Sequence, residues 1–189
     1  MAKDRQFAES INDIRPDHTA RYAFASNMLG RKSVLDIACG CGYGSWMLYM
    51  TGNVVTGVDI DQEAIDYAKR YYEGPTYLCQ KAEETKGEWD VLVTFETLEH
   101  LRDPAGLLKA VQAKQVIASV PNEERYPFRA EMFGMDDYPH QRHYTPAEFD
   151  RLFEESGYTV ESRHNQGDKM GKVYPGPNGN FLIYIANRA

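Results

Sequence analysis

The sequence has few cysteines, no long apolar run and no excess of positive charge. Three cysteines among 189 residues, none in a Cys-x-x-Cys pair, exclude a disulfide framework and a cysteine-based zinc site. No stretch approaches the roughly 20 apolar residues that a membrane-spanning helix needs. Residues 1–5 already contain three charged residues, and no apolar core of a signal peptide follows them. We therefore expect a cytoplasmic protein without membrane association.

The charge balance is acidic and disfavours nucleic-acid partners. The 21 lysines and arginines are outnumbered by 28 acidic residues, which gives a formal charge of −7. Affinity for a phosphate backbone comes from clustered lysine and arginine, so we expect no DNA binding. Residues 121–164 hold five arginines, no lysine and ten acidic residues, which makes RNA an improbable partner as well. The length and the 42% hydrophobic content are those of one globular domain, 1–189.

Short apolar runs alternate with helical patterns, which is typical of an α/β fold with a parallel sheet covered by helices. The spacing predicts helices over 17–29, 46–50, 62–72, 104–113 and 145–156. It predicts strands over 34–37, 54–59, 76–79, 89–95, 116–120, 158–162 and 181–185. The last two strands have no helix between them and should form an antiparallel pair. Two segments remain irregular: 121–144, and 165–180, which is expected to be a mobile hairpin loop.

A turn of small residues, 36–42, leaves the first predicted strand and opens a helix. Backbone N–H groups in such a turn can approach an anionic ligand. Asp59 ends the next strand, 19 residues after Gly40, where an acidic side chain can accept hydrogen bonds from both hydroxyls of a ribose. The dinucleotide fingerprint asks for Gly or Ala at position 45, which is Ser45 here, so another nucleoside is favoured.

The run 34–42 resembles motif I of the class I S-adenosylmethionine-dependent methyltransferases, with Ala38 in place of the first glycine. Residues 58–60 resemble the ribose-binding strand end of that family, 81–83 its adenine-side loop, and 95–101 its fourth strand end with a Glu-His signature. Residues 18–25 and 119–122 are similar to those of small methyltransferases that act on glycans. The resemblance implies a Rossmann-like, mostly parallel seven-stranded sheet of order 3-2-1-4-5-7-6 with an antiparallel last strand.

The resemblance also implies S-adenosylmethionine as the cofactor and a hydroxyl of a sugar or other small polar molecule as the methyl acceptor. The implied cofactor-binding residues are Asp36, Ala38, Gly40, Gly42, Tyr43, Asp59, Ile60, Ala82, Glu83 and Phe95, with Arg21 and Tyr22 closing over the methionine end. Structural alternatives remain for some of them. Tyr22 could be a core residue, Glu83 part of a solvated surface run, and Asp59 only a helix cap.

An alcohol acceptor must lose its proton, so a general base with a pKa near the working pH helps the reaction. His100 follows the fourth strand, at the edge where the methyl group should lie, and is the preferred base beside Glu99. His140 and His143 end the 121–144 segment, which we expect to be an acceptor-side loop or lid. Alternatively, His100 buttresses the helix at Pro104, and the other two histidines serve packing or lie on the surface.

Alternatively, the same residues could bind a metal ion instead of acting as a general base. If the turn after the fourth strand is helical, Glu96, Glu99 and His100 share one face, and His140 would complete a set for Mg²⁺ or Mn²⁺. This arrangement resembles the small-RNA 2′-O-methyltransferases, whose Glu-x-x-Glu-His is completed by a later histidine. A third alternative is a cofactor-binding subunit without catalysis.

Overall fold

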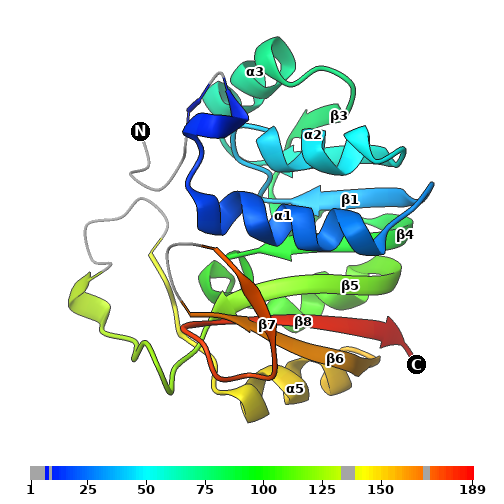
Figure 1. Cartoon of the computed structure of the whole chain (residues 1–189). Coiled ribbons are helices and arrows are strands. Elements are labelled where there is room, and N and C mark those ends of the chain that lie inside the picture. The colour runs from blue at the N-terminus through cyan, green and yellow to red at the C-terminus, as the bar shows by residue number, and fades with distance from the viewer. Residues whose placement is uncertain (1–6, 9, 133–138, 168–170) are drawn as a thin grey trace.

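The structure is a computed structural model that describes residues 7–8, 10–132, 139–167 and 171–189. Its centre is a sheet of order β3-β2-β1-β4-β5-β8-β6-β7 with helices on both faces (Figure 1). The strands are β1 Ser33–Ile37, β2 Val54–Asp59, β3 Thr76–Cys79, β4 Gly87–Phe95, β5 Val111–Pro121, β6 Tyr158–Gln166, β7 Val173–Pro175 and β8 Phe181–Arg188. The predicted Rossmann-like fold is confirmed.

The five longer helices begin where the sequence supplies capping groups. They are α1 Pro16–Met28, α2 Tyr43–Met50, α3 Gln62–Tyr71, α4 Pro104–Ala110 and α5 Pro146–Glu155, with 3₁₀ turns η1 Ile11–Asp13, η2 Ala82–Glu84, η3 Leu98–His100 and η4 Ala130–Met132. The Asp61 carboxylate accepts from the N–H groups of Glu63 and Ala64 at the start of α3. Thr145 and Glu148 form a reciprocal capping box at the start of α5.

The first five strands of the sheet, from β3 to β5, run parallel, so their carboxyl ends meet at one edge. In register, Ile37 of β1 pairs with Val58 of β2 and with Thr94 of β4. β8 is antiparallel to both β5 and β6, as the predicted order requires. The loops that follow β1, β2 and β4 therefore come together at this carboxyl edge.

The predicted sheet lacks one strand that the structure contains. Part of the expected 165–180 loop is the edge strand β7, which pairs antiparallel with an extended β6. The Asn165 side chain donates to the carbonyls of Tyr174, Pro175 and Gly176, the last at 2.7 Å. A buried amide that bonds three carbonyls holds the chain in a hairpin, which composition alone does not reveal.

The junction between α4 and β5 also differs from the prediction. α4 ends at Ala110 rather than at 113, and β5 begins at Val111 rather than at 116. Val111 and Ala113 are buried while Gln112 and Lys114 are exposed, which is the two-residue period of a strand. The Tyr158 hydroxyl lies 3.1–3.3 Å from the carbonyls of Leu108, Val111 and Ala113 and binds this junction.

Two apolar clusters cover the two faces of the sheet. α1, α2 and α3 bury Ala25, Leu48 and Ile65 on one face. α4 and α5 bury Leu108 and Phe149 on the other. Among the helices of the described chain, none combines the length and the apolar character needed to cross a membrane.

Candidate active site

The glycine turn and Asp59 meet at the carboxyl edge of the sheet. The Gly40 N–H donates to Asp59 Oδ2 at 2.9 Å, and the Asp61 N–H donates to Oδ1 at 3.0 Å. These two bonds fix the orientation of the carboxylate where the carboxyl ends of the paired strands β1 and β2 meet. The arrangement predicted from the spacing of the two motifs is present.

The two glycines of this turn have different surroundings. Ala38, Gly40 and Gly42 all have left-handed backbone conformations, with φ of 60°, 55° and 88°. A Cβ added to Gly40 would meet nothing within 4 Å, whereas one added to Gly42 would lie 2.5 Å from the Cβ of Ala68. Gly40 therefore leaves space for a ligand, and Gly42 lets α3 pack closely on the turn.

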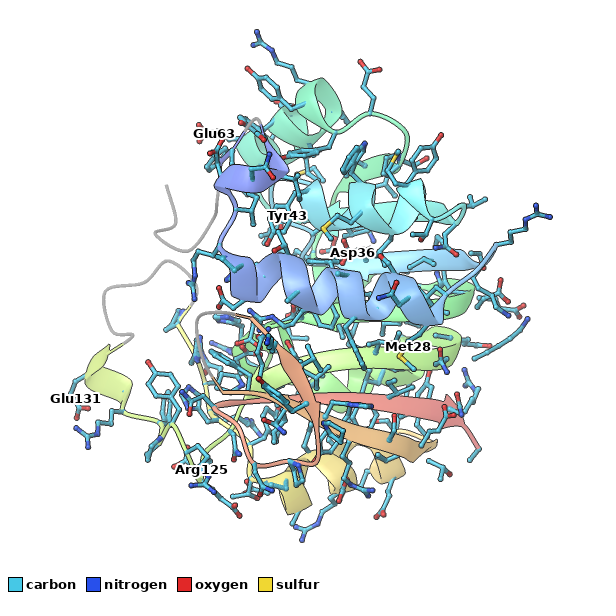
Figure 2. All side chains as sticks on the ribbon, in the orientation of Figure 1. Met28, Asp36, Tyr43, Glu63, Arg125 and Glu131 are labelled. Atoms are coloured by element: carbon cyan, nitrogen blue, oxygen red, sulfur yellow. The ribbon has the colours of Figure 1, made fainter. Side chains whose placement is uncertain are left out.

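Asp36 is fully buried beneath α1 and next to the turn. Its carboxylate accepts from Ser45 Oγ at 2.6 Å and from the Tyr22 hydroxyl at 3.1 Å. Burial raises the pKa of Asp36 to about 7, and the two hydrogen bonds oppose that rise. Tyr22 is buried and packs edge-on against Tyr43 and Phe95, and its closing over the methionine end of a cofactor stays a prediction. Figure 2 shows Asp36 and Tyr43 inside the molecule, and Arg125 on the projecting loop.

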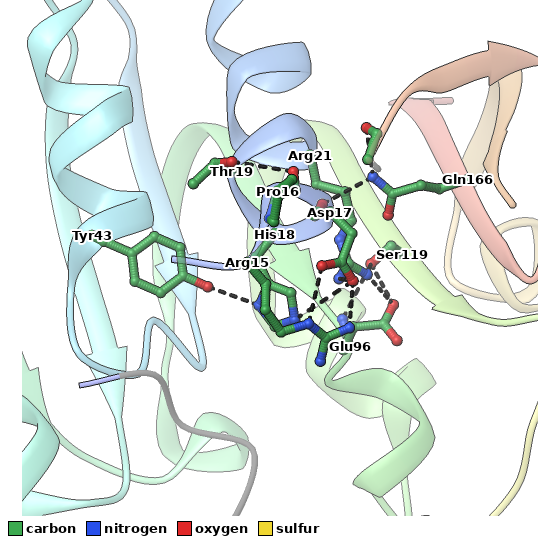
Figure 3. A network of polar contacts seen from close by, with 11 residues as sticks. Arg15, Pro16, Asp17, His18, Thr19, Arg21, Tyr43, Glu96, Ser119 and Gln166 are labelled. Carbon is green, nitrogen blue, oxygen red and sulfur yellow. Dashed lines mark hydrogen bonds and ion pairs between the residues drawn. The ribbon is translucent and has the colours of Figure 1, made fainter. Parts of the chain in front are cut away.

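An ion-pair network, buried at Arg21 and Asp17, joins α1 to the end of β4 (Figure 3). Arg21 Nη1 lies 2.9 Å from Glu96 Oε1, and the Ser119 hydroxyl donates to the same oxygen at 2.7 Å. Asp17, also buried, pairs with Arg15 at 2.6 Å. Arg21 therefore reaches the edge of β4 already paired with an acid.

This network shows that the prediction for Glu96 as a metal ligand on one face with Glu99 and His100 is wrong. Glu96 has a left-handed φ of 51° and lies before the 3₁₀ turn that begins at Leu98. Its carboxylate turns toward Arg21, so Glu96 does not share a face with Glu99 and His100. The helical spacing that would have aligned them does not form, because the turn is 3₁₀ and short.

Glu99, His100, His140 and His143 lie together at the same edge. One ligand atom each from Glu99, His100 and His140 fall within 4.8 Å of one another. The rings of His100 and His140 are 4.5 Å apart, and His140 Nδ1 lies 2.9 Å from His143 Nε2. The four residues predicted to be catalytic are thus neighbours, although 40 positions separate the two segments. We call them the Glu99–His143 cluster.

Glu99 is the unusual member of the cluster. Its side chain is fully buried, and neither carboxylate oxygen has a hydrogen-bond partner in the described part of the chain. Burial, followed by the charge of Glu96, raises the pKa of Glu99 well above its usual range. A buried carboxyl group that has no partner among the described residues is unfavourable for stability, so this group points to a role with a ligand.

The loop that brings the histidines to Glu99 is closed at its base. The Glu123 N–H donates to the Tyr144 carbonyl at 2.9 Å, and the Gln141 N–H donates to the Glu99 carbonyl at 2.8 Å. The buried Asn122 side chain donates to the Gly179 carbonyl at 2.9 Å. Within the predicted lid 121–144, residues 133–138 lie outside the described residues.

The residues predicted for the adenine side differ in exposure. Ile60 follows Asp59 and is exposed, and Glu83 is exposed on η2. Ala82 packs against the core below α4, and Phe95 is buried against Tyr22. Their contact with adenine stays a prediction.

His18 was missed by the sequence analysis. Its Nδ1 lies 2.9 Å from the hydroxyl of Tyr43, the first residue of α2. Burial, and then Arg21, lower the pKa of His18 to about 4, so the ring is neutral near pH 7. The two residues meet because α1 packs on α2, and no sequence spacing signals that contact.

The sheet order and the glycine–aspartate pair together define the class I S-adenosylmethionine-dependent methyltransferase fold. The chain belongs to the methyltransferase domain family, whose model matches residues 7–163.

Curated relatives are O-methyltransferases. The chain is 35% identical over 106 residues to a ubiquinone biosynthesis O-methyltransferase of Coxiella burnetii, covering 52% of this chain and 44% of the relative. It is 28% identical over 172 residues to a protein of the same name from Aeromonas salmonicida, covering 79% and 71%. The chain spans about half the length of the first of these relatives.

Solved structures share the fold at low identity. A possible histamine N-methyltransferase from Thermotoga maritima matches with a TM-score of 0.75 at 16% identity, covering 93% of this chain and 91% of that one. The magnesium protoporphyrin IX methyltransferase of Synechocystis PCC 6803 with bound S-adenosylhomocysteine matches with a TM-score of 0.65 at 18% identity, covering 92% and 81%.

Proposed function

We propose that this chain transfers a methyl group from S-adenosylmethionine to a hydroxyl oxygen of a small polar acceptor. The observation that carries the proposal is the position of the Glu99–His143 cluster at the edge where Gly40 and Asp59 meet. The methyl donor and the group that accepts the proton would then lie at the same carboxyl edge of the sheet. The names of the curated relatives support oxygen as the methylated atom.

In the proposed cofactor site, Asp59 accepts hydrogen bonds from the ribose hydroxyls and the open Gly40 turn contacts the amino-acid end. Binding would release Asp59 from the Gly40 N–H, which can then donate to the ligand carboxylate. Asp36, Ala38, Tyr43 and Phe95 line the methionine side, with Arg21 behind Glu96. Ile60, Ala82 and Glu83 flank the adenine. Gly42 supports this site through packing.

For the proposed reaction, the protein has to position the acceptor hydroxyl against the methyl group and remove its proton. The sulfonium is an activated donor, so alignment of the acceptor oxygen with the methyl–sulfur bond supplies much of the rate. The acceptor oxygen bonds the methyl carbon, the sulfur keeps the electron pair of the broken bond, and the hydroxyl proton passes to a histidine. His100 and His140 are the two candidates, because their rings are 4.5 Å apart beside Glu99.

Two classes of acceptor are candidates. The resemblance in 18–25 and 119–122 favours a sugar hydroxyl, and the relatives' names favour a hydroxyl on an intermediate of ubiquinone biosynthesis, for which catechol serves as a simple aromatic test compound. Transfer of a labelled methyl group to methyl glucoside and to catechol, read by mass spectrometry, separates the two. Transfer to nitrogen compounds alone would contradict the proposal, and cofactor binding without transfer to any acceptor would favour a non-catalytic subunit.

Metal-assisted transfer, as in an RNA 2′-O-methyltransferase, is the second candidate. The Glu99 carboxylate lies beside two histidines and has no hydrogen-bond partner among the residues that the structure describes, which favours this candidate. A divalent cation held by Glu99, His100 and His140 would lower the pKa of an adjacent hydroxyl. Glu96 would not be among the ligands while it pairs with Arg21. Loss of transfer in excess EDTA, restored by Mn²⁺ or Mg²⁺, is the expected result for this candidate, and full activity in EDTA eliminates it.

A further inference from the structure

The first turn of α1 places a histidine next to the glycine turn. β1 begins at the edge of the sheet opposite its carboxyl end, so α1, which leads into β1, begins at the carboxyl edge (Figure 1). His18, Arg21 and Tyr22 are spaced i, i+3 and i+4 on this helix and therefore share one face. That face packs on α2, whose first residue, Tyr43, directly follows the glycine turn.

Arg21 and Tyr22 direct their polar groups at acidic side chains of the fold. The Arg21 guanidinium is 3% exposed and lies 2.9 Å from a Glu96 oxygen. The Tyr22 hydroxyl donates to the buried carboxylate of Asp36 at 3.1 Å. A group that binds the methionine end of the cofactor without breaking these bonds has to come from elsewhere on the same helix face.

His18 has such a group. Its Nδ1 lies 2.9 Å from the Tyr43 hydroxyl, and its Nε2 has no hydrogen-bond partner among the described residues. The Asp17 carboxylate, 3.9 Å from Nε2, is too distant for a hydrogen bond and already accepts two from Arg15. Figure 3 shows the ring between Tyr43 and Asp17. The side chain is 21% exposed, so a ligand can reach one edge of it.

The pair formed by His18 and Tyr43 always has a hydrogen to donate. A neutral imidazole has one N–H group and a phenol has one O–H group, and the bond between the two side chains uses only one of these hydrogens. If Tyr43 donates, the N–H at Nε2 of His18 remains, and if His18 donates, the hydroxyl hydrogen of Tyr43 remains. A protonated ring adds one more N–H. The pair can therefore donate to an anionic group in either protonation state of the ring.

The amino-acid end of the cofactor belongs on this side of the site. In the proposed cofactor site, Asp59 holds the ribose at the end of β2, and Gly40 follows the neighbouring strand β1. The sheet order β2-β1-β4 then directs the rest of the ligand toward β4, which α1 reaches through the ion pair of Arg21 with Glu96. The Gly40 N–H can bond one carboxylate oxygen of the ligand, and the other oxygen needs a second donor.

We propose that His18 and Tyr43 together bind the carboxylate of the amino-acid end of S-adenosylmethionine. The inference rests on the proposed cofactor site and adds to it the side chains that recognise the amino-acid portion. It depends neither on the acceptor nor on a metal ion. Adenosine compounds that lack the amino acid would not use this pair, so two ligands measured side by side test it.

The test compares S-adenosylhomocysteine with 5′-methylthioadenosine, which keeps the adenosine and the thioether but lacks the carboxylate. In the double variant His18→Phe/Tyr43→Phe, calorimetry should show a Kd for S-adenosylhomocysteine raised about 10- to 100-fold. The Kd for 5′-methylthioadenosine should stay within about threefold of wild type, which also shows that the variant is folded. His18→Gln, whose amide supplies a donor, should keep most of the affinity for S-adenosylhomocysteine.

The matched control is His164→Phe, which replaces a histidine of β6 whose ring packs on Phe24 at 4.8 Å. It should bind both ligands as wild type does. Equal losses for the two ligands in the folded double variant, or unchanged affinity for S-adenosylhomocysteine, would overturn the inference while the cofactor site stands. Wild-type protein that binds neither ligand contradicts the proposed cofactor site itself. If circular dichroism shows that the double variant is unfolded, His18→Phe alone gives the same comparison between ligands.

Discussion

At the residue scale, the turn after β1 contains two glycines with different surroundings. Gly40 faces open space, and Gly42 packs closely against α3. Gly40 and Gly42 share a left-handed backbone and differ only in what faces their missing side chains. The two substitutions to alanine therefore separate conformational strain from steric overlap. Both glycines belong to one sequence motif, so the motif alone does not tell their roles apart.

We expect Gly42→Ala to destabilise the fold by about 2–4 kcal/mol, because left-handed strain adds to a clash with the Ala68 Cβ. Gly40→Ala should cost only about 1–2 kcal/mol, from strain alone. Urea unfolding monitored by circular dichroism measures both. Equal losses in the two variants would contradict this division of roles.

Asp59 should determine cofactor affinity. In the proposed cofactor site, Asp59→Ala would remove the acceptor for both ribose hydroxyls, and hydrogen bonds to a charged group contribute about 1.5–3 kcal/mol. Calorimetry with S-adenosylhomocysteine should therefore show a Kd raised about 10- to 100-fold. Asp66→Ala, on the exposed side of α3, is the control and should bind normally. Unchanged affinity in Asp59→Ala would make Asp59 only a helix-start residue.

At the scale of elements, β5 and the β6–β7 hairpin show how tertiary contacts change local preferences. Residues 111–115 follow a helix directly and carry no turn signal, so the sequence suggests a longer α4. Their pairing with β4, from Gly87 with Val111 onward, makes them a strand instead. The Tyr158 hydroxyl, supplied by β6, then binds the carbonyls at the junction.

Tyr158→Phe should therefore destabilise the protein by about 1–2 kcal/mol, because the α4–β5 junction loses a buried hydroxyl donor that lies within reach of its carbonyls. Tyr174→Phe is a control of the same chemistry, since Tyr174 on β7 is 47% exposed. It should unfold at the wild-type urea concentration. A neutral Tyr158→Phe would mean that strand pairing alone holds the junction.

At the scale of the whole molecule, the shifted pKa values of His18 and Asp36 have opposite effects on how the free energy of unfolding changes with pH. The pKa of His18 falls to about 4 in the folded state, so the unfolded chain binds more protons between about pH 4 and 6.5. The pKa of Asp36 rises to about 7, so the folded chain binds more protons between pH 3.8 and 7.

The contribution of His18 is present above pH 6.5 and is lost as the pH falls toward 4. His18→Asn should remove this dependence, by about 1–3 kcal/mol across that window. The contribution of Asp36 is present below pH 3.8 and is lost as the pH rises toward 7, so Asp36→Asn should be relatively more stable at pH 8 than at pH 4. Denaturant unfolding at several pH values measures both. Parallel pH profiles for wild type and either variant would contradict the assignment.

The amino-acid sequence by itself determined the α/β class, the parallel core of the sheet, the helix caps and the residues that gather at its carboxyl edge. These follow from local periodicity, from capping chemistry, and from motifs at strand ends that a parallel sheet brings to one side. Only the tertiary structure decided that Glu96 pairs with Arg21 rather than with Glu99, and that His18 meets Tyr43. It also decided that the Tyr126 carbonyl lies 2.6 Å from His143 Nδ1. The reason is that side-chain direction and burial depend on contacts between segments far apart in the chain, which local sequence spacing does not encode.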